Sequence, residues 1–468
     1  MTGHRRPGRA RRARGRRQPE SGWQDLARIK VEPGAAVYAE GWQSWSIVSA
    51  LPVTTAPYQV TSPESLAIDC QYAAAPPPGV HQGSGLLAID PGGGAPVQVF
   101  GTDQATDTVP LVRARALNGS MLVSADQPVS HTADAGPGGL TGALGRWGEK
   151  FAARAGVPAG ALRPVPPGWC SWYQYYAAVT QEDILANLAA MDHLGLDIGV
   201  VQIDDGYEAA PGDWLVPSAQ FGDLPGVIAR IRGSGRRAGI WVAPMLVGRS
   251  SALFAKHPDW VVRSPGTGEP VFAGNVVGQL CTALDVTHPG AAAYLTRVFS
   301  VLRDWGADYF KLDFAYAGAC EGIRHEQVTG VQAYRQALRL IRAAAGPQSL
   351  LVGCGAPVLP TAGLVDAMRV GPDIAAGFQP PDGNPSKPSQ LNASRNVVAR
   401  AWQHGRLWVN DPDCLIARPD VERREDWAAT VQQFGGLRAS GDDLARLDAW
   451  GLAVTRRLLV PSPTAPLT

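Results

Sequence analysis

IGVVQIDD, at residues 198–205, decides the fold of this chain: a mostly apolar run ends in two aspartates. Strands that are buried on both faces read as such continuous hydrophobic runs. Seven more runs share the pattern, and helical patterns separate most of them: PPGWCSWY (166–173), AGIWVAP (238–244), DYFKLDF (308–314), LLVGCGAP (350–357), AMRVGPD (367–373), LWVNDPD (407–413) and FGGLRASG (434–441). Eight such units predict an α/β fold, a parallel (β/α)8 TIM barrel whose chemistry lies at the C-terminal strand ends.

The rest of the chain divides by composition. Residues 21–140 alternate apolar and polar positions between Gly, Pro and Asp turns, which predicts an N-terminal antiparallel β-sandwich. We expect a helical linker at 141–164, the barrel at 165–460 and a short tail at 461–468. Residues 1–20 hold eight arginines and one glutamate, and we expect a disordered tail there.

The composition restricts the partners. The formal net charge is +1 and 45% of residues are hydrophobic, which is ordinary for a globular protein. For the arginine tail, a solvated segment or a mis-chosen start codon is favoured over attraction to nucleic acid or an anionic membrane. No apolar signal region follows it, and no apolar run reaches about 18 residues. We therefore expect neither a nucleic-acid nor a membrane partner.

Cysteine and histidine patterns bear on metals and compartment. The six cysteines form no CxxC pair, and the eight histidines form no HxH or HExxH pair. Reduced thiols and a cytoplasmic location are expected. The sequence predicts no metal and no cofactor.

Lys311 and Asp313 form the first candidate catalytic pair. The alternation of a strand puts both side chains on one face, where the ammonium would keep the aspartate ionised. An ionised, positioned carboxylate suits a nucleophile. A purely structural Lys–Asp pair inside the barrel is the alternative.

Asp373 follows Arg369 by four residues, and Gly371 and Pro372 force a tight exit from the sixth run. A carboxyl group held in a semi-apolar turn can act as a general acid, although a turn aspartate is nearly as good an explanation. Runs four and six lie on one half of an eight-strand ring. Their carboxyl groups could therefore face each other at about 5 Å, the spacing of a retaining glycosidase.

Two further acidic pairs and several aromatic residues accompany these groups. Asp204 with Asp205, and Asp411 with Asp413, also end apolar runs. Flat rings can pack against the C–H faces of sugars. Aromatic residues gather in or beside the same segments: Trp45, Trp169, Trp172, Tyr173, Trp214 and Trp241. A long excursion after Pro244, carrying Trp260, is interpreted as a substrate-covering insertion.

The motifs together resemble glycoside hydrolase family 36, the melibiase and raffinose-processing α-galactosidases. They are GWQSWS (41–46), WCSWYQYY (169–176), QIDDGY (202–207), GIWVAP (239–244), FKLDF (310–314), VGCGAP (352–357) and RVGPD (369–373). The resemblance implies a β-sandwich before the barrel and a retaining double displacement without metal. Asp313 would be the nucleophile and Asp373 the acid/base, while Asp204 and Asp205 would bind the 4- and 6-hydroxyls of galactose.

The resemblance also implies the remaining binding residues. Lys311 and Arg369 would bind further hydroxyls, and Cys354 would stand near the 2-hydroxyl. The pocket would be lined by Trp241 and Trp172, with Trp45 reaching in from the sandwich and Tyr173 as a further match.

This chain departs from the family at both ends. It stops after the last barrel helix, so the C-terminal β-domain of relatives is expected to be absent. The sandwich is also shorter than expected. A truncated sandwich would expose edge strands, which is compatible with a homo-oligomer.

The leading hypothesis is an exo-α-galactosidase that hydrolyses terminal non-reducing α-D-galactosyl residues of oligosaccharides. A transferase passing the galactosyl group to an acceptor sugar, like raffinose synthase, shares the same motifs. A glycosidase for α-N-acetylgalactosamine, a catalytically silent sugar-binding protein and a metal-dependent barrel hydrolase remain alternatives.

Overall fold

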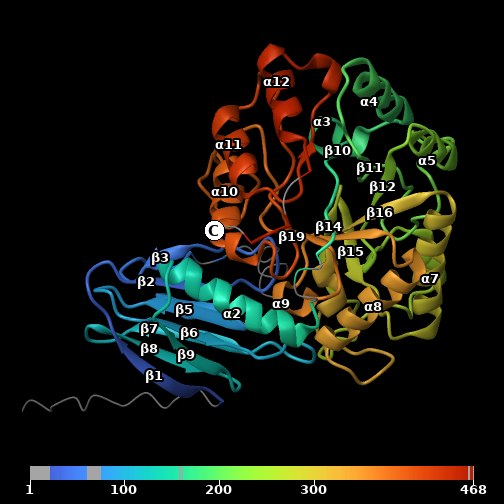
Figure 1. The fold of residues 1–468 in the computed structure, drawn as a ribbon. Coiled ribbons are helices and arrows are strands. Elements are labelled where there is room, and N and C mark those ends of the chain that lie inside the picture. The colour runs from blue at the N-terminus through green and yellow to red at the C-terminus, as the bar shows by residue number, and fades with distance from the viewer. Residues whose placement is uncertain are drawn as a thin grey trace, which may run out of the picture.

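The computed structural model describes residues 22–58, 60, 75–157, 160, 162–461 and 464–466. The arginine-rich tail predicted at 1–20 lies outside these residues. Within them, no helix combines the length and apolarity that crossing a membrane requires. The chain has an α/β fold in which a curled parallel sheet and separate antiparallel sheets lie side by side (Figure 1).

The eight predicted apolar runs each contribute one strand to an eight-stranded parallel sheet, in the order β19-β18-β17-β16-β12-β11-β10-β20. The strands are β10 (Gly168–Cys170), β11 (Val200–Ile203), β12 (Arg237–Val242), β16 (Ala307–Leu312), β17 (Leu350–Gly353), β18 (Ala367–Arg369), β19 (Val409–Asp411) and β20 (Ala439–Ser440). The two edges of the sheet approach each other. The Leu437 amide donates to the Asn410 carbonyl at 2.9 Å, and the Leu415 amide donates to the Ala439 carbonyl at 2.6 Å.

Helices follow most of these strands. The longer ones are α4 (Gln181–His193), α5 (Leu224–Gly233), α7 (Pro289–Asp304), α8 (Gly330–Ala345), α10 (Gln390–Ala399), α11 (Arg424–Phe434) and α12 (Ala449–Leu458). Short helices are α3 (Trp172–Tyr175), α6 (Ala252–Lys256), α9 (Val358–Thr361), η1 (Tyr176–Ala178), η2 (Ala315–Ala319), η3 (Ala401–Gln403) and η4 (Leu444–Arg446). Helix α4 begins at a capping box, in which Thr180 and Asp183 each accept the other's backbone amide proton.

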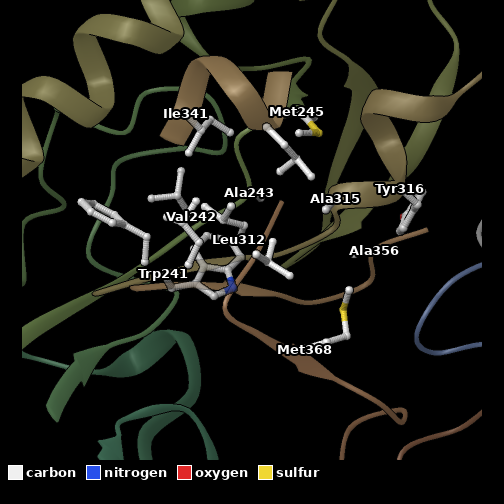
Figure 2. Close-up of a cluster of buried hydrophobic side chains, with 14 of the residues drawn as sticks. Trp241, Val242, Ala243, Met245, Leu312, Ala315, Tyr316, Ile341, Ala356 and Met368 are labelled. Atoms are coloured by element: carbon white, nitrogen blue, oxygen red, sulfur yellow. The ribbon is translucent and has the colours of Figure 1, made fainter. Parts of the chain in front are cut away.

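Apolar side chains fill the space between the parallel strands and the helices. Trp241 and Val242 of β12, Leu312 of β16 and Ile341 of α8 belong to one buried cluster (Figure 2). Burial of each large apolar side chain contributes about 1.5–3 kcal/mol. The polar residues that follow the strands are therefore held on a tightly packed base.

Residues before the parallel sheet form two antiparallel sheets. One has the order β1-β8-β7-β4, with β1 (Gln24–Lys30), β8 (Ser120–Ala125), β7 (Leu111–Ala116) and β4 (Val80–Ser84). The other has the order β3-β2-β5-β6-β9, with β3 (Ala50–Pro52), β2 (Ala36–Ala39), β5 (Leu86–Asp90), β6 (Val97–Gly101) and β9 (Ser130–Asp134). Side chains from both sheets, among them Phe100 and Val123, share one buried cluster.

Helix α2 (Gly139–Ala155) lies across β5 and β6 and leads toward the parallel sheet (Figure 1). A helical connection is predicted in this part of the sequence, and a helix is present. Trp147 stacks on Phe151 with ring centroids 5.1 Å apart and meets Trp402 of η3 edge-on at 5.8 Å. The helix therefore packs against both the antiparallel and the parallel part of the chain.

A buried ion pair links the residue before the GWQSWS segment to the part of the chain that forms the parallel sheet. Arg400, at the end of α10, lies 2.7 Å from Glu40, and both side chains are fully buried. The same guanidinium donates to the Gln43 carbonyl at 3.2 Å. Tyr38 and Gln403 donate to the second carboxylate oxygen of Glu40 at 2.6 and 2.9 Å. Both carboxylate oxygens of the buried Glu40 therefore have hydrogen-bond partners, which offsets the cost of burying the charge.

The first prediction concerns this ion pair. Replacing Arg400 by Met leaves the Glu40 carboxylate buried without its cation, so the free energy of unfolding should fall by about 3–5 kcal/mol. Asp382→Asn is the matched control, because Asp382 pairs with Lys387 at 2.7 Å where both side chains are more than half exposed. It should change stability by less than about 1 kcal/mol. Equal losses in urea unfolding of the two variants would contradict this role of Arg400.

Candidate active site

A pocket opens where the parallel strands end. Eight of the eleven site residues predicted from the sequence line it: Trp45, Trp172, Asp204, Asp205, Trp241, Lys311, Asp313 and Asp373. Phe314, Asn275, Val276 and Val277 complete the lining. Tyr173, Cys354 and Arg369 do not line this pocket. The structure therefore brings both candidate catalytic aspartates into one cavity.

Lys311 joins two of the carboxylates at the floor of the pocket. Its ammonium nitrogen lies 3.1 Å from Asp204 Oδ2 and 3.6 Å from Asp313 Oδ2. Burial disfavours the charge on Lys311, but the two carboxylates outweigh it and raise its pKa well above the usual value. The lysine therefore stays charged between the two carboxyl groups. The same-face placement of Lys311 and Asp313 predicted from strand alternation is present.

The orientation of Asp313 is fixed by groups on both of its oxygens. The indole nitrogen of Trp241 donates to Oδ2 at 2.9 Å, and the Phe314 amide donates to Oδ1 at 2.8 Å. Phe314 adopts the left-handed backbone conformation, with φ at 47°. Bulky residues rarely adopt it, and such strain tends to occur at functional sites. The carboxylate is thus positioned by its neighbours before any ligand arrives.

Asp205 pairs with Glu208, a residue that the sequence reasoning missed. Both are buried, with 6% and 7% of their surface exposed, and their carboxyl groups are hydrogen-bonded to each other. Burial and the Glu208 carboxylate raise the pKa of Asp205 to about 9. Burial also raises the pKa of Glu208. Two carboxyl groups in such contact share a proton at neutral pH.

Arg369 forms ion pairs with three carboxylates beside the pocket. Its guanidinium lies 2.9 Å from Asp373, 2.7 Å from Asp413 and 3.8 Å from Asp411. Tyr173 is buried beside it and donates its hydroxyl to Asp413. Arg369 and Tyr173, predicted to bind the substrate, contact these carboxylates and are absent from the pocket lining. Asp413 was noted as a strand-end acid, but its link to Arg369 could not be read from the sequence.

Asp373 is the most exposed of these carboxylates, with 34% of its side-chain surface accessible. Burial raises its pKa, and Asp313 and Asp204 add to the rise, whereas Arg369 and Lys311 oppose it. The direction favours the protonated form of Asp373, which is the form that a general acid needs.

Three tryptophans form walls of the pocket. Trp45 of the GWQSWS segment lies edge-on to Phe314, with ring centroids 5.1 Å apart. It covers Gly355, where a Cβ atom would come within 3.0 Å of the ring and φ is 51°. The Trp45 indole N–H is buried without a hydrogen-bond partner.

Cys354, which precedes Gly355, is fully buried, and the pKa of its thiol is raised by burial and by Asp313.

The excursion after Pro244 forms a small sheet of its own with the order β13-β15-β14. Its strands are β13 (Leu246–Gly248), β14 (Phe272–Val276) and β15 (Gln279–Ala283). The tip of the β14–β15 hairpin lines the pocket, whereas Trp260 stacks on His257 at 3.7 Å and has no place in the lining. An insertion at the pocket was expected, but the residues that line it were not identified. The sequence gives little signal for this turn, because Val277-Gly278 lacks the Asn or Asp that favours it.

The described residues contain no group of three or more His, Cys, Asp or Glu side chains that could hold a metal ion.

Comparisons with known proteins agree with the site. A model of the family Melibiase matches residues 162–343. The bifunctional α-galactosidase/sucrose kinase AgaSK of Mediterraneibacter gnavus is 30% identical over 199 residues, which are 39% of this chain and 20% of that protein. An α-galactosidase of Escherichia coli is 30% identical over 166 residues, 33% of this chain and 22% of that protein. The chain thus spans about a fifth of the length of these curated relatives.

Solved structures extend the similarity along the chain. TtGalA, an α-galactosidase from Thermus thermophilus in complex with p-nitrophenyl α-D-galactopyranoside, is 27% identical. It aligns over 96% of this chain and 91% of its own, with a TM-score of 0.76. The GH36 α-galactosidase AgaA from Geobacillus stearothermophilus aligns over 92% of this chain and 61% of its own with a TM-score of 0.62, and at 15% identity it shows the fold alone. The resemblance to glycoside hydrolase family 36 is confirmed.

The second prediction concerns the Asp205–Glu208 pair. The folded pKa of Asp205, about 9, exceeds its unfolded value of about 4. The stabilisation linked to protonated Asp205 is therefore fully present below pH 4 and is lost as the pH rises through 9. In Glu208→Gln the like charge is gone, so the pKa of Asp205 falls. Each unit of that fall reduces the loss by about 1.4 kcal/mol.

Urea unfolding between pH 5 and 10 measures this difference. The parent should lose more stability with rising pH than Glu208→Gln does. Glu182→Gln is the control, since Glu182 lies exposed in the first turn of α4 and should leave the pH dependence unchanged. Superimposable pH profiles of the parent and Glu208→Gln would show that the two carboxyl groups do not share a proton.

Proposed function

We propose that this chain, a relative of the family 36 α-galactosidases, is a retaining exo-α-galactosidase that hydrolyses terminal α-D-galactosyl residues of oligosaccharides. One observation carries the proposal: Asp313 and Asp373 line the same pocket, with Lys311 3.6 Å from the first and Arg369 2.9 Å from the second. The p-nitrophenyl α-galactoside and stachyose complexes of TtGalA, which is 27–28% identical to this chain, support the choice of substrate class.

We further infer the finer architecture that the sequence predicts. The curled sheet is a closed (β/α)8 barrel, supported by the hydrogen bonds from Leu437 and Leu415 that link its two edges. The two antiparallel sheets, which share a buried cluster, form a β-sandwich in front of it. A cytoplasmic location is supported by the buried free thiols of Cys170, Cys281, Cys354 and Cys414; Cys70 lies outside the described residues.

The first chemical step follows from the two aspartates. Asp313 attacks the anomeric carbon; Lys311 lies 3.6 Å from its carboxyl group, and the indole nitrogen of Trp241 orients it. Asp373, whose pKa is raised by burial, gives its proton to the leaving oxygen as the glycosidic bond breaks. The result is a galactosyl ester of Asp313 and a free leaving sugar.

The second step reverses the proton transfer. Asp373, now ionised, takes a proton from a water molecule that attacks the anomeric carbon and releases Asp313. Two inversions give net retention. Arg369, 2.9 Å from Asp373, stabilises the ionised form of the acid between the two steps.

Selection of galactose is assigned to the acidic pair on the pocket floor. Asp204 is held by Lys311, Gln202 and the Cys170 thiol, so its position is fixed. It and Asp205 accept hydrogen bonds from the axial 4-hydroxyl and the 6-hydroxyl. A site built to bond a hydroxyl group disfavours an epimer that places it elsewhere, because buried polar groups then lose their partner.

The third prediction tests the nucleophile. Asp313→Ala should lower kcat on aryl α-galactosides by on the order of 10⁴-fold. Azide should restore turnover and yield β-galactosyl azide, because the small anion fills the vacated space and attacks from the same face. Asp308→Asn is the control: Asp308 lies on the same strand, near its start, and pairs with Arg232. It should keep its activity and give no azide product; rescue yielding the α-azide would rule out Asp313 as nucleophile.

The fourth prediction tests the acid. In Asp373→Ala, glycosylation by substrates with poor leaving groups should slow by about 10²–10⁴-fold. Activated dinitrophenyl substrates should lose much less, since their leaving oxygen needs little protonation. Pre-steady-state release of the leaving group measures this step. Equal losses on both substrate types would argue against proton donation by Asp373.

A further inference from the structure

The β14–β15 hairpin supplies one wall of the pocket through three consecutive residues, Asn275, Val276 and Val277. Val276 is buried with 3% of its surface exposed, whereas Val277 at the tip is 61% exposed. Val276 therefore belongs to the hydrophobic core and anchors the wall. Asn275 and Val277 are free to contact a ligand.

The beginning of the hairpin, in β14, is hydrogen-bonded to the segment that follows the proposed nucleophile Asp313. Tyr316, three residues after Asp313, donates its hydroxyl to the Ala273 carbonyl at 2.8 Å. Gly274 has φ at 133°, and a Cβ atom there would lie 2.9 Å from the Tyr316 hydroxyl. Glycine is thus required for this close approach. The hairpin and Asp313 hold a fixed position relative to each other.

The turn itself has an unfavourable residue at its tip. Val277 has φ at 46° and Gly278 has φ at 78°. Asn-Gly or Asp-Gly is the preferred pair for such a turn, and a β-branched residue is strained in the left-handed region. Most of the Val277 side chain is exposed, so core packing does not explain why a valine occupies this strained position. We attribute the valine to its place in the pocket wall.

The hairpin and Asp205 line the same pocket. Asn275 and Val277 therefore share this space with the group to which the proposed function assigns the 6-hydroxyl of galactose. A substituent on that oxygen would extend toward the hairpin wall.

We propose that Val277, with Asn275 beside it, is the specificity-determining wall that restricts the site to galactosyl groups unsubstituted at O6. This inference rests on the proposed function, because it takes Asp205 as the partner of that hydroxyl. The wall acts by exclusion: a sugar with a group on O6 meets the rigid turn before its anomeric carbon reaches Asp313. Galactosyl residues extended at O6 are thereby rejected, and only chain ends are cleaved.

The test compares nitrophenyl α-galactoside with nitrophenyl 6-O-methyl-α-galactoside. Val277→Gly removes the side chain and suits the φ of the turn, so the hairpin keeps its shape. The ratio of kcat/KM for the methylated over the unmodified substrate should rise at least about tenfold, a change worth about 1.4 kcal/mol. Val277→Asn, which tolerates the same φ and restores bulk, should leave the ratio near that of the parent.

Leu280→Ala is the matched control. Leu280 lies on the same hairpin opposite Asn275 and is 52% exposed, but it does not line the pocket. Its ratio should equal that of the parent. An unchanged ratio in Val277→Gly, or an equal rise in Leu280→Ala, would overturn the inference. Failure of the parent to cleave either substrate would instead contradict the proposed function.

Discussion

The buried ammonium of Lys311 is the interaction on which the rest of the site depends. Removing a lysine from water is costly, and it persists here only because Asp204 and Asp313 lie within 3.1 and 3.6 Å. The same contacts fix the positions of both carboxyl groups. Arg369 pairs with several acids at once, and of these Asp373 is the partly exposed one with a raised pKa. Two buried cations thus position the carboxyl groups of one pocket.

The fold supplies this arrangement from distant parts of the chain. The carboxylates stand at the ends of parallel strands, so their backbones are fixed by the sheet. Trp45 comes from a segment more than a hundred residues earlier, which the Glu40–Arg400 pair holds against the strand ends. The backbone amide of Ser44 reinforces that attachment by donating to Ala356 at 3.0 Å. The pocket is therefore a joint product of the antiparallel and parallel parts.

Much of this could be predicted because the signals are local. Each apolar run became a strand, and strand alternation correctly put Lys311 and Asp313 on one face. Other contacts are encoded by no spacing in the sequence. Arg369 pairs with three carboxylates outside the pocket lining. Glu208 was missed because its partner is set by a loop conformation, and within the excursion the hairpin rather than Trp260 lines the pocket.

The most direct test identifies the carboxylate that becomes bonded to the sugar. A 5-fluoro-α-galactosyl fluoride should form the ester rapidly and hydrolyse it slowly, because fluorine destabilises the second, oxocarbenium-like transition state. Proteolysis and mass spectrometry of the trapped protein locate the label. We predict one label per chain, on Asp313. A label on Asp204, Asp205 or another carboxylate, or turnover to an inverted product with no label at all, would contradict the assignment.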